Sequence, residues 1–239
     1  MSDAARRLRL GVLCPMPSEL RPVVRRLGLQ HHATAAGRAL HSGTVGDVEV
    51  TATTTGIGLT AATAATGALL SSGSIDHLLV VGIAGGIDPE VQIGDVVIPA
   101  VVVDDATGTE YRPDRFGDSE PRGRLVSSDD LLIDPDAHAR LTDAGVAAVD
   151  METAAVGAVC QDRGCRWSVF RGISDHARDG MIDNELLALA GPDGGGDLRA
   201  VLRYLFRRPW RIARLARLGR DSGLAARRAA DAMAQALPG

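Results

Sequence analysis

Apolar runs rich in valine, isoleucine and leucine recur along the chain, and segments with helical patterns lie between them. Ser18–Leu27 is a clear helix, because its apolar residues form one stripe at helical spacing. This alternation is the βαβ signature of an α/β domain with a mostly parallel sheet. The predicted strands are Leu8–Leu13, Val48–Thr54, Leu78–Val81, Val96–Val103, Ala147–Val149 and Ser168–Ile173, and the other predicted helices are Thr60–Ser71 and Met151–Gln161.

Polar and glycine-rich segments divide these elements. Gly46 and Asp47 separate two strand-like runs and predict an antiparallel hairpin. Asp104–Gly123 is polar and contains prolines and glycines, so it is interpreted as a long loop, of the kind that is usually functional or mobile. A second loop, Ala190–Asp197, precedes two predicted helices, Asp197–Arg208 and Pro209–Met233.

The charge composition excludes several chemistries. All 26 basic residues of the 239 are arginines, so Schiff-base chemistry and a P-loop lysine are excluded. The net charge is −4, yet Arg203–Arg228 carries nine arginines against one acid, Asp221. With only 3% aromatic residues and no stacking motif, a nucleic-acid-binding groove is not expected.

Neither a membrane span nor a structural metal site is expected from the sequence. The longest apolar stretches, such as Val96–Val103, are far shorter than a membrane span, and the N-terminus lacks a signal-peptide pattern, so a cytoplasmic protein is predicted. Cys14, Cys160 and Cys165 are too few and too irregularly spaced for a disulfide framework or a zinc site. They are interpreted as small core residues.

Four carboxylates follow predicted strands at the edge where α/β sheets bind ligands. Asp150 and Glu152 come after Ala147–Val149 and open a helix, whose dipole favours ionised Glu152. Asp175 ends a much more apolar strand, and such surroundings tend to raise a carboxyl pKa and keep a proton available. Glu19 opens the helix after the first strand. Taken alone, Glu152 is better explained as an ordinary acid at a helix start and Glu19 as a surface residue, and an aspartate such as Asp175 commonly caps a turn. Three acid sites converging on one edge suggest distinct catalytic roles.

Two glycine stretches lie near the same edge. "TTTGIG" ends at Gly58 before a helix, and "VVGIAGG" ends at Gly86 after a buried strand. Neither is the dinucleotide fingerprint, and no acid follows at the expected distance, so NAD binding is not expected. Glycines here would let the backbone approach a small ligand closely.

Six short motifs follow one another along the chain: "MPSE" (16–19), "TGIG" (55–58), "GIAGG" (82–86), "IGDVVI" (93–98), "VDMETAA" (149–155) and "RGISD" (171–175). Taken together, they resemble the purine nucleoside phosphorylase superfamily, and most closely its 5′-methylthioadenosine/S-adenosylhomocysteine nucleosidases. The likeness implies a single α/β domain, residues 1–193, with a central mixed, partly barrel-like β-sheet flanked by helices. Residues 194–239 then form an arginine-rich helical extension packed on or appended to it.

The resemblance also implies roles for individual residues. Glu19 matches the acid that holds the attacking water, Glu152 the acid that binds the ribose hydroxyls, and Asp175 the acid that helps to protonate the purine at N7. Such chemistry needs a proton donor at the base and a positioned nucleophile, but no metal or cofactor. The residues expected to bind the substrate are Met16, Ile57, Ile83, Ala84, Gly85, Tyr111, Leu131, Leu132, Asp150, Met151 and Ser174, with Tyr111 and Pro113 near the 5′ substituent, across the interface of an expected homodimer.

Two positions at which this chain differs from phosphorylase relatives bear on the identity of the nucleophile. Phosphorylase relatives place an arginine at the position of Val80 and a serine at that of Ile83, and both are apolar here, which favours water over phosphate. Many nucleosidases also keep the serine, so the substrate stays open between 5′-methylthioadenosine or S-adenosylhomocysteine, futalosine-type nucleosides and adenosylhopane. Phosphorolysis and a catalytically inactive nucleoside-binding regulator are the remaining alternatives.

The arginine-rich end resembles that of hopanoid-associated members of the superfamily. A basic helix with Trp210, Ile212, Leu215 and Leu218 on its apolar side could lie on an anionic membrane. A helix packed on the body of the protein or on a partner subunit is favoured over this membrane contact.

Overall fold

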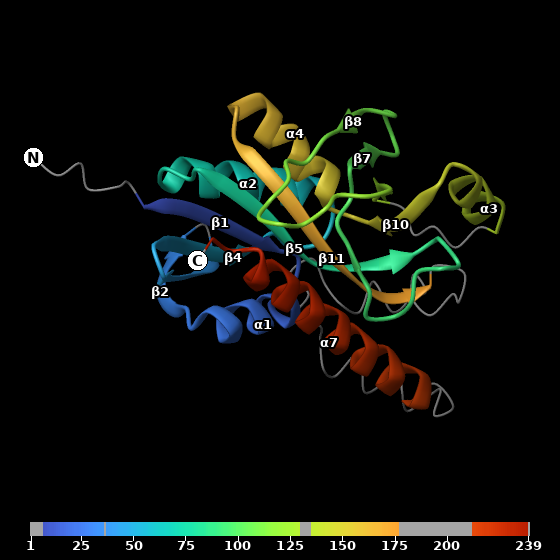
Figure 1. Ribbon diagram of the computed structural model, residues 1–239, viewed down its shortest axis with the longest axis horizontal. Coiled ribbons are helices and arrows are strands. Elements are labelled where there is room, and N and C mark those ends of the chain that lie inside the picture. The colour runs from blue at the N-terminus through green and yellow to red at the C-terminus, as the bar shows by residue number, and fades with distance from the viewer. Residues whose placement is uncertain (1–6, 36, 130–134, 177–211, 239) are drawn as a thin grey trace, which may run out of the picture.

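A computed structural model describes residues 7–35, 37–129, 135–176 and 212–238 of the chain. It confirms a single α/β domain built on a central mixed sheet (Figure 1). The strands are β1 Leu8–Cys14, β2 Gln30–Ala35, β3 Arg38–Val45, β4 Val48–Thr54, β5 His77–Gly86, β6 Val96–Val97, β7 Val101–Asp104, β8 Glu110–Tyr111, β9 Arg124–Ser127, β10 Val146–Asp150 and β11 Arg166–His176. The helices are α1 Pro17–Leu27, α2 Leu59–Ser72, α3 Pro135–Asp143, α4 Thr153–Arg163 and α7 Ile212–Gln235.

The long strand β5 is the centre of the sheet. It pairs in parallel with β1 along its first half and with β11 along its whole length, and β10 joins it antiparallel at Gly85 and Gly86. On the far side of β1 the order continues through β4 to β3 and β2, and the β3–β4 pair is the antiparallel hairpin predicted at Gly46–Asp47. The carboxyl ends of β1, β4, β5 and β11 therefore meet at one edge.

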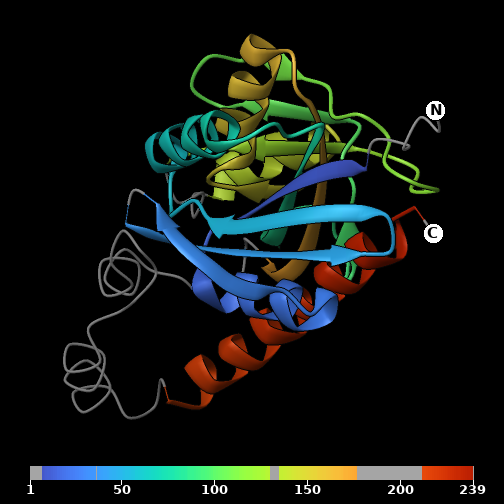
Figure 2. The same cartoon turned by 90° about the vertical axis from the view of Figure 1, so that its left-hand side faces the viewer.

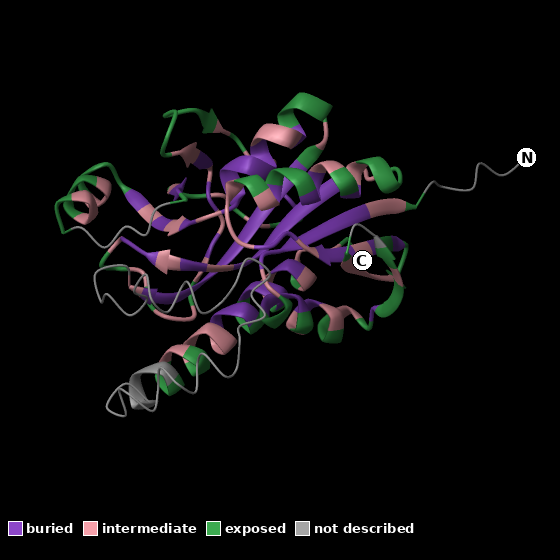
Figure 3. Cartoon of the chain, turned by 180° about the vertical axis from the view of Figure 1, so that it is seen from behind, coloured by how far each residue is buried: buried purple, intermediate pink, exposed green. Residues whose placement is uncertain are grey.

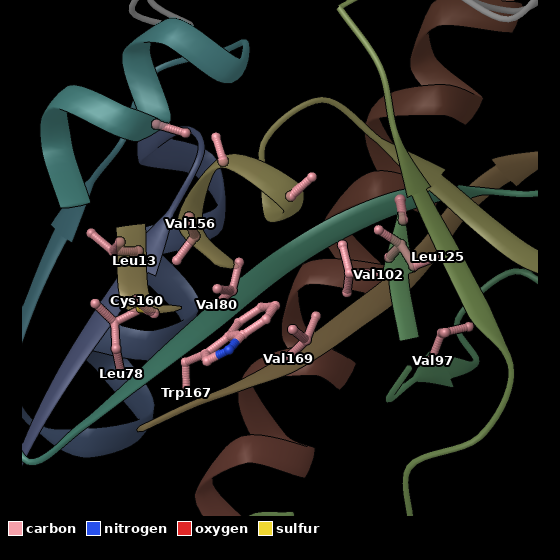
Figure 4. Packing of buried hydrophobic residues seen from close by; sticks show 14 of the residues in the cluster. Leu13, Leu78, Val80, Val97, Val102, Leu125, Val156, Cys160, Trp167 and Val169 are labelled. Atoms are coloured by element: carbon pink, nitrogen blue, oxygen red, sulfur yellow. The ribbon is translucent and has the colours of Figure 1, made fainter. Parts of the chain in front are cut away.

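Two helical layers cover the sheet, α2 with α4 on one face and α1 with α7 on the other (Figures 1 and 2). Because side chains alternate along a strand, β5 sends Leu78 and Val80 to the first layer and Leu79 and Val81 to the second. Trp167 packs beside Val80 and Val169 in the first core (Figure 4). The central strands are consequently buried on both faces (Figure 3).

Several predicted elements differ from those observed. Val96–Val103 is not one strand, because Pro99, which lacks a backbone N–H, separates β6 from β7. The glycines of "VVGIAGG" belong to β5 itself, and part of the expected loop 104–123 forms β8, which pairs with β7. β2, β9 and α3 were not predicted.

Helix α7 packs on the body through its second half. Ala225, Ala226, Ala229, Ala230 and Met233 are buried, against α1, β5 and β11. Within the described residues no helix is long and apolar enough to cross a membrane. The predicted helix 197–208, the loop 190–197, the domain boundary at 193 and the side chains of Trp210, Ile212 and Leu215 lie outside the described residues, so membrane contact stays untested.

We predict that Gly172→Ala destabilises the protein by about 1–3 kcal/mol, the usual cost of overpacking. A Cβ on Gly172 of β11 would overlap the backbone of Ala225 on α7, which cannot shift without moving the helix. Urea unfolding measures the change. Gly67→Ala in α2 is the control: nothing lies within 4 Å of its Cβ, so it should gain about 0.5–1 kcal/mol. Unchanged stability of Gly172→Ala would mean that α7 does not approach β11 so closely.

Candidate active site

A fully buried arginine, Arg171, gathers three carboxylates at the carboxyl edge of the sheet. Its guanidinium lies 2.7 Å from Asp150, 3.2 Å from Glu152 and 3.9 Å from Glu19. Strand β11 carries the arginine, and the acids come from α1, from the end of β10 and from the residue that caps α4. Elements distant in sequence thus meet at this single side chain.

Glu19 is held at the start of α1 by two backbone donors. The N–H of Met16 donates to Oε1 at 3.1 Å, and that of Ile83 on β5 donates to Oε2 at 2.7 Å. Gly82 allows this approach, because a Cβ there would overlap both Glu19 and the Arg171 guanidinium. The glycine therefore makes room for the charged side chains rather than directly for a ligand.

Glu152 lies at the N-cap of α4, where its side chain turns toward the start of α2. Its Oε1 accepts the N–H of Gly58 at 3.2 Å, and its Oε2 accepts from Arg171. Burial raises the pKa of Glu152, more strongly than Arg171 and the Gly58 N–H lower it. The expectation that a helix dipole keeps Glu152 ionised is therefore wrong in direction, because desolvation outweighs the dipole.

One cation cannot neutralise three buried carboxylates, so the cluster retains protons near neutral pH. Burial raises the pKa of Glu19 to about 7, against the opposing influence of Arg171. Burial lowers the pKa of Arg171, but Asp150, Glu152 and Glu19 together raise it above its ordinary value. The arginine stays charged while the glutamates can exchange protons.

Asp150 is engaged entirely within the protein. The Ser127 hydroxyl donates to its Oδ1 at 2.6 Å, and the Thr153 hydroxyl and Arg171 donate to its Oδ2. The backbone N–H groups of Glu152 and Thr153 also donate to Oδ1. These contacts place Asp150 as the residue that holds Arg171, and its expected contact with substrate stays a prediction.

Asp175 lies further along β11, past an irregularity in its pairing with β5. The register shifts between Ile173 and Asp175, so that Asp175 aligns with Gly85. Such bulges re-aim side chains next to active sites. The Ser174 hydroxyl donates to Oδ1 of Asp175 at 2.6 Å, and both residues are buried.

The remaining predicted residues divide into three groups. Met16, Ile57, Ile83, Gly85 and Met151 are half-buried around the acids, and Ala84 is buried beside Ser174. Leu131 and Leu132 lie outside the described residues. Tyr111, on β8, packs against Trp167 and Gly157 in the core, so within one chain the structure does not bring it to the carboxylates. Its role across a dimer interface stays a prediction.

The sequence argument missed Arg171, Ser127 and Thr153. A signal for Arg171 was present, since an arginine inside the apolar strand "WSVFRGIS" must be paired with carboxylates if that strand is buried. Ser127 and Thr153 carry no comparable signal, because their role depends on β9 lying beside β10.

The arrangement can hold, donate and accept protons around a neutral polar ligand. Within residues 7–35, 37–129, 135–176 and 212–238, no group of three or more His, Cys, Asp and Glu side chains is arranged to hold a metal ion.

Known proteins resemble this chain in sequence and in fold. The 5′-methylthioadenosine/S-adenosylhomocysteine nucleosidase of Tolumonas auensis is 26% identical over 83% of this chain and its own full length. The fold is similar to that of the corresponding Helicobacter pylori nucleosidase complexed with a substituted pyrrolidin-3-ol, with a TM-score of 0.72 and 17% identity over 95% of this chain and 97% of that one. Futalosine hydrolase of the same organism gives a TM-score of 0.71 at 17% identity, over 95% of this chain and 96% of its own.

A family model covers most of the chain. The model described as the phosphorylase superfamily matches residues 9–139 and 120–190, which include Glu19, Glu152, Arg171 and Asp175. The chain belongs to the phosphorylase superfamily.

Proposed function

We propose that this protein is a nucleosidase that hydrolyses the N-glycosidic bond of an adenine nucleoside such as 5′-methylthioadenosine or S-adenosylhomocysteine. The observation that carries the proposal is the buried cluster of Arg171 with Glu19 and Glu152, next to Asp175 on the same strand. The nucleosidase relative that spans 83% of this chain supports the same reaction.

Glu19 and Arg171 supply the site for water. Nη1 of Arg171 is buried and has no hydrogen-bond partner among the described residues, and Oε2 of Glu19 lies 3.9 Å from it. A water molecule that donates to Glu19 and accepts from Arg171 would have its oxygen oriented for attack on C1′. With a pKa of about 7, Glu19 can take the water's proton at neutral pH.

Glu152 and Asp175 act on the two sides of the bond that breaks. Glu152 holds the ribose hydroxyls in place, a role that a hydrogen-bonding carboxyl group can perform with or without its proton. Asp175, with Ser174 hydrogen-bonded to it, donates a proton to N7, so that the base leaves as a neutral molecule while the C1′–N9 electron pair moves onto the purine.

Electrostatics favours water over phosphate. Val80 is buried in the core and offers nothing to an anion, and Ile83 contributes an apolar side chain. Arg171 is already paired with Asp150 and Glu152, which leaves little of its charge for a phosphate dianion. The fold itself does not indicate which 5′ substituent the substrate carries, since futalosine hydrolase is as similar in fold to this chain as the methylthioadenosine nucleosidase is.

The first prediction from this proposal is that adenine is released from an adenine nucleoside in phosphate-free buffer, with free sugar as the second product. A panel of 5′-methylthioadenosine, S-adenosylhomocysteine, futalosine and adenosine, followed by chromatography of the released base, measures it. A requirement for phosphate with formation of ribose 1-phosphate would refute hydrolysis. Absence of base release from the whole panel would favour the inactive nucleoside-binding regulator.

The second prediction separates the acids by role. Asp175→Asn should lower turnover of an adenine nucleoside about 10²–10⁴-fold, the usual contribution of a general acid. It should leave a 4-nitrophenyl riboside nearly unaffected, because that leaving group needs no proton. Glu152→Gln and Glu19→Gln should impair both substrates.

The exposed Asp118→Asn variant is the matched control and should leave both rates unchanged. Equal losses on the two substrates in Asp175→Asn would show that Asp175 does not protonate the leaving group.

The third prediction follows from the raised pKa of Glu19. Folded Glu19 binds its proton more tightly than unfolded Glu19, so its contribution to stability is complete below about pH 4.5 and is lost as the pH rises to about 7. Between these limits the wild type should lose at most about 3 kcal/mol relative to Glu19→Gln, since one pKa unit corresponds to about 1.4 kcal/mol.

Urea unfolding of both proteins at several pH values measures this difference. Glu90→Gln, at an exposed position, should follow the wild type. Parallel pH dependences of the wild type and Glu19→Gln would show that Glu19 ionises as an ordinary carboxyl and is not tuned for proton transfer at neutral pH.

A further inference from the structure

The start of helix α2 is held by a carboxylate from a distant part of the chain. Oδ1 of Asp129, just beyond the end of β9, accepts the backbone N–H of Leu59 at 2.8 Å. Leu59 is the first residue of α2, and Gly58 before it has no side chain that could cap the helix. The first N–H groups of a helix lack partners within the helix and favour a negative charge nearby. Asp129 therefore supplies the cap that the local sequence does not.

The conformation of this turn is not fixed by its own side chains. Gly56 and Gly58 have φ angles of 82° and 96°, in the left-handed region that favours glycine. Because glycine adopts many backbone conformations, contacts from outside the turn must select the observed one. Asp129 provides such a contact, since a Cβ on Gly58 would lie only 3.1 Å from its Oδ1. The carboxylate thus packs directly against Gly58 while it holds Leu59.

The same turn orients Glu152. The N–H of Gly58 donates to Oε1 of Glu152 at 3.2 Å, and Arg171 donates to Oε2 at 3.2 Å. These two donors fix the plane of the carboxyl group. A carboxyl oxygen can take part in more than one hydrogen bond, so both oxygens can still bind ribose hydroxyls. Because Gly58 and Leu59 are consecutive, an anchor at Leu59 also restricts the direction of the Gly58 N–H.

Asp129 is itself presented by the strand pair that carries Asp150. Strands β9 and β10 pair in parallel, and at their ends the backbone N–H of Ser128 donates to the carbonyl oxygen of Asp150 at 2.9 Å. Asp150 in turn binds Arg171. The contacts thus close a ring that runs from Arg171 through Glu152, the α2 turn and Asp129 back to Asp150. Asp129 is the exposed carboxylate of this ring, whereas Asp150 and Glu152 are buried.

We propose that Asp129 is a positioning residue for the ribose, which holds Glu152, through the first turn of α2, in the orientation that binds the sugar hydroxyls. The inference rests on the proposed nucleosidase function, in which Glu152 contacts the ribose. Asp129 acts as a hydrogen-bond acceptor and does not itself touch the sugar. Its effect therefore depends on the sugar hydroxyls and is independent of the protonation of the base by Asp175.

The test compares 5′-methylthioadenosine with its 2′-deoxy and 3′-deoxy analogues, each of which lacks one hydroxyl that Glu152 can hold. Asp129→Ala should lower kcat/KM for 5′-methylthioadenosine about tenfold, the size expected for loss of a hydrogen bond to a charged group, and mainly through KM. The loss should be clearly smaller on an analogue without the hydroxyl that Glu152 binds, because both changes remove the same contact. Asp129→Asn keeps an acceptor oxygen and should retain most of the activity.

Leu59→Pro removes the other partner of the contact without ending the helix. Proline is tolerated at the first helical position, and the ψ angle of 158° at Gly58 suits a residue before proline. Leu59→Ala keeps the N–H and controls for the lost side chain. In the Leu59→Pro background, Asp129→Ala should cause little further loss, since the N–H that Asp129 binds is already absent. If Asp129→Ala alone fails to fold, Leu59→Pro compared with Leu59→Ala measures the same contact.

Asp76→Ala is the matched control. The carboxylate of Asp76 also accepts the backbone N–H of a distant residue, Arg9, at 3.0 Å, but at the opposite edge of the sheet, where β1 and β5 begin. This variant should lower the melting temperature without changing the preference for the ribose hydroxyls. Equal losses of Asp129→Ala on 5′-methylthioadenosine and on both deoxy analogues, or no loss on any of them, would overturn the proposal.

Calorimetric titration with the same three nucleosides separates this inference from the nucleosidase function. If the wild type cleaves none of them, that function fails. The role of Asp129 then still stands if the wild type binds 5′-methylthioadenosine more tightly than the deoxy analogues and Asp129→Ala loses this difference. If the wild type cleaves them and Asp129→Ala keeps the full preference for the hydroxyls, the function stands and the positioning role is wrong. A protein that neither cleaves nor binds them would overturn both.

Discussion

The site depends on the burial of one arginine. Removing the guanidinium of Arg171 from water costs several kcal/mol unless carboxylates compensate it, and breaking such a buried pair by removing one partner typically costs about 3–5 kcal/mol. Asp150, Glu152 and Glu19 supply the compensation from three different elements. Correct packing of α1, β10 and α4 on β11 is therefore a condition for burying Arg171, and fold and site are specified together.

The three acids are not equivalent. Asp150 lies nearest to Arg171 and accepts further hydrogen bonds from Ser127, Thr153 and the backbone, so it is the partner that balances the charge. Glu152 and Glu19 lie further from the guanidinium, and burial raises the pKa of both. Burial, against the opposing influence of Arg171, thus leaves two glutamates able to bind and release protons, which acid–base catalysis requires.

The elements predicted well from the sequence were those with strong local patterns. Val48–Thr54 alternates and pairs as predicted. The helices α1, α2 and α4 were predicted to within two residues at each end. β2, with the polar sequence "QHHATA", forms only because β3 pairs with it, and no local pattern reveals that. The sequence likewise located Glu19, Glu152 and Asp175 at one edge but gave the wrong direction for the pKa of Glu152, because desolvation depends on what packs around a residue.

The charge distribution along the sheet edge limits the ligands that suit it. At β1, β5 and β11 the acids outnumber Arg171, so this part attracts a sugar that becomes positively charged and disfavours a phosphate nucleophile. The buried arginine therefore does not turn this edge into an anion site, because its near partners are carboxylates.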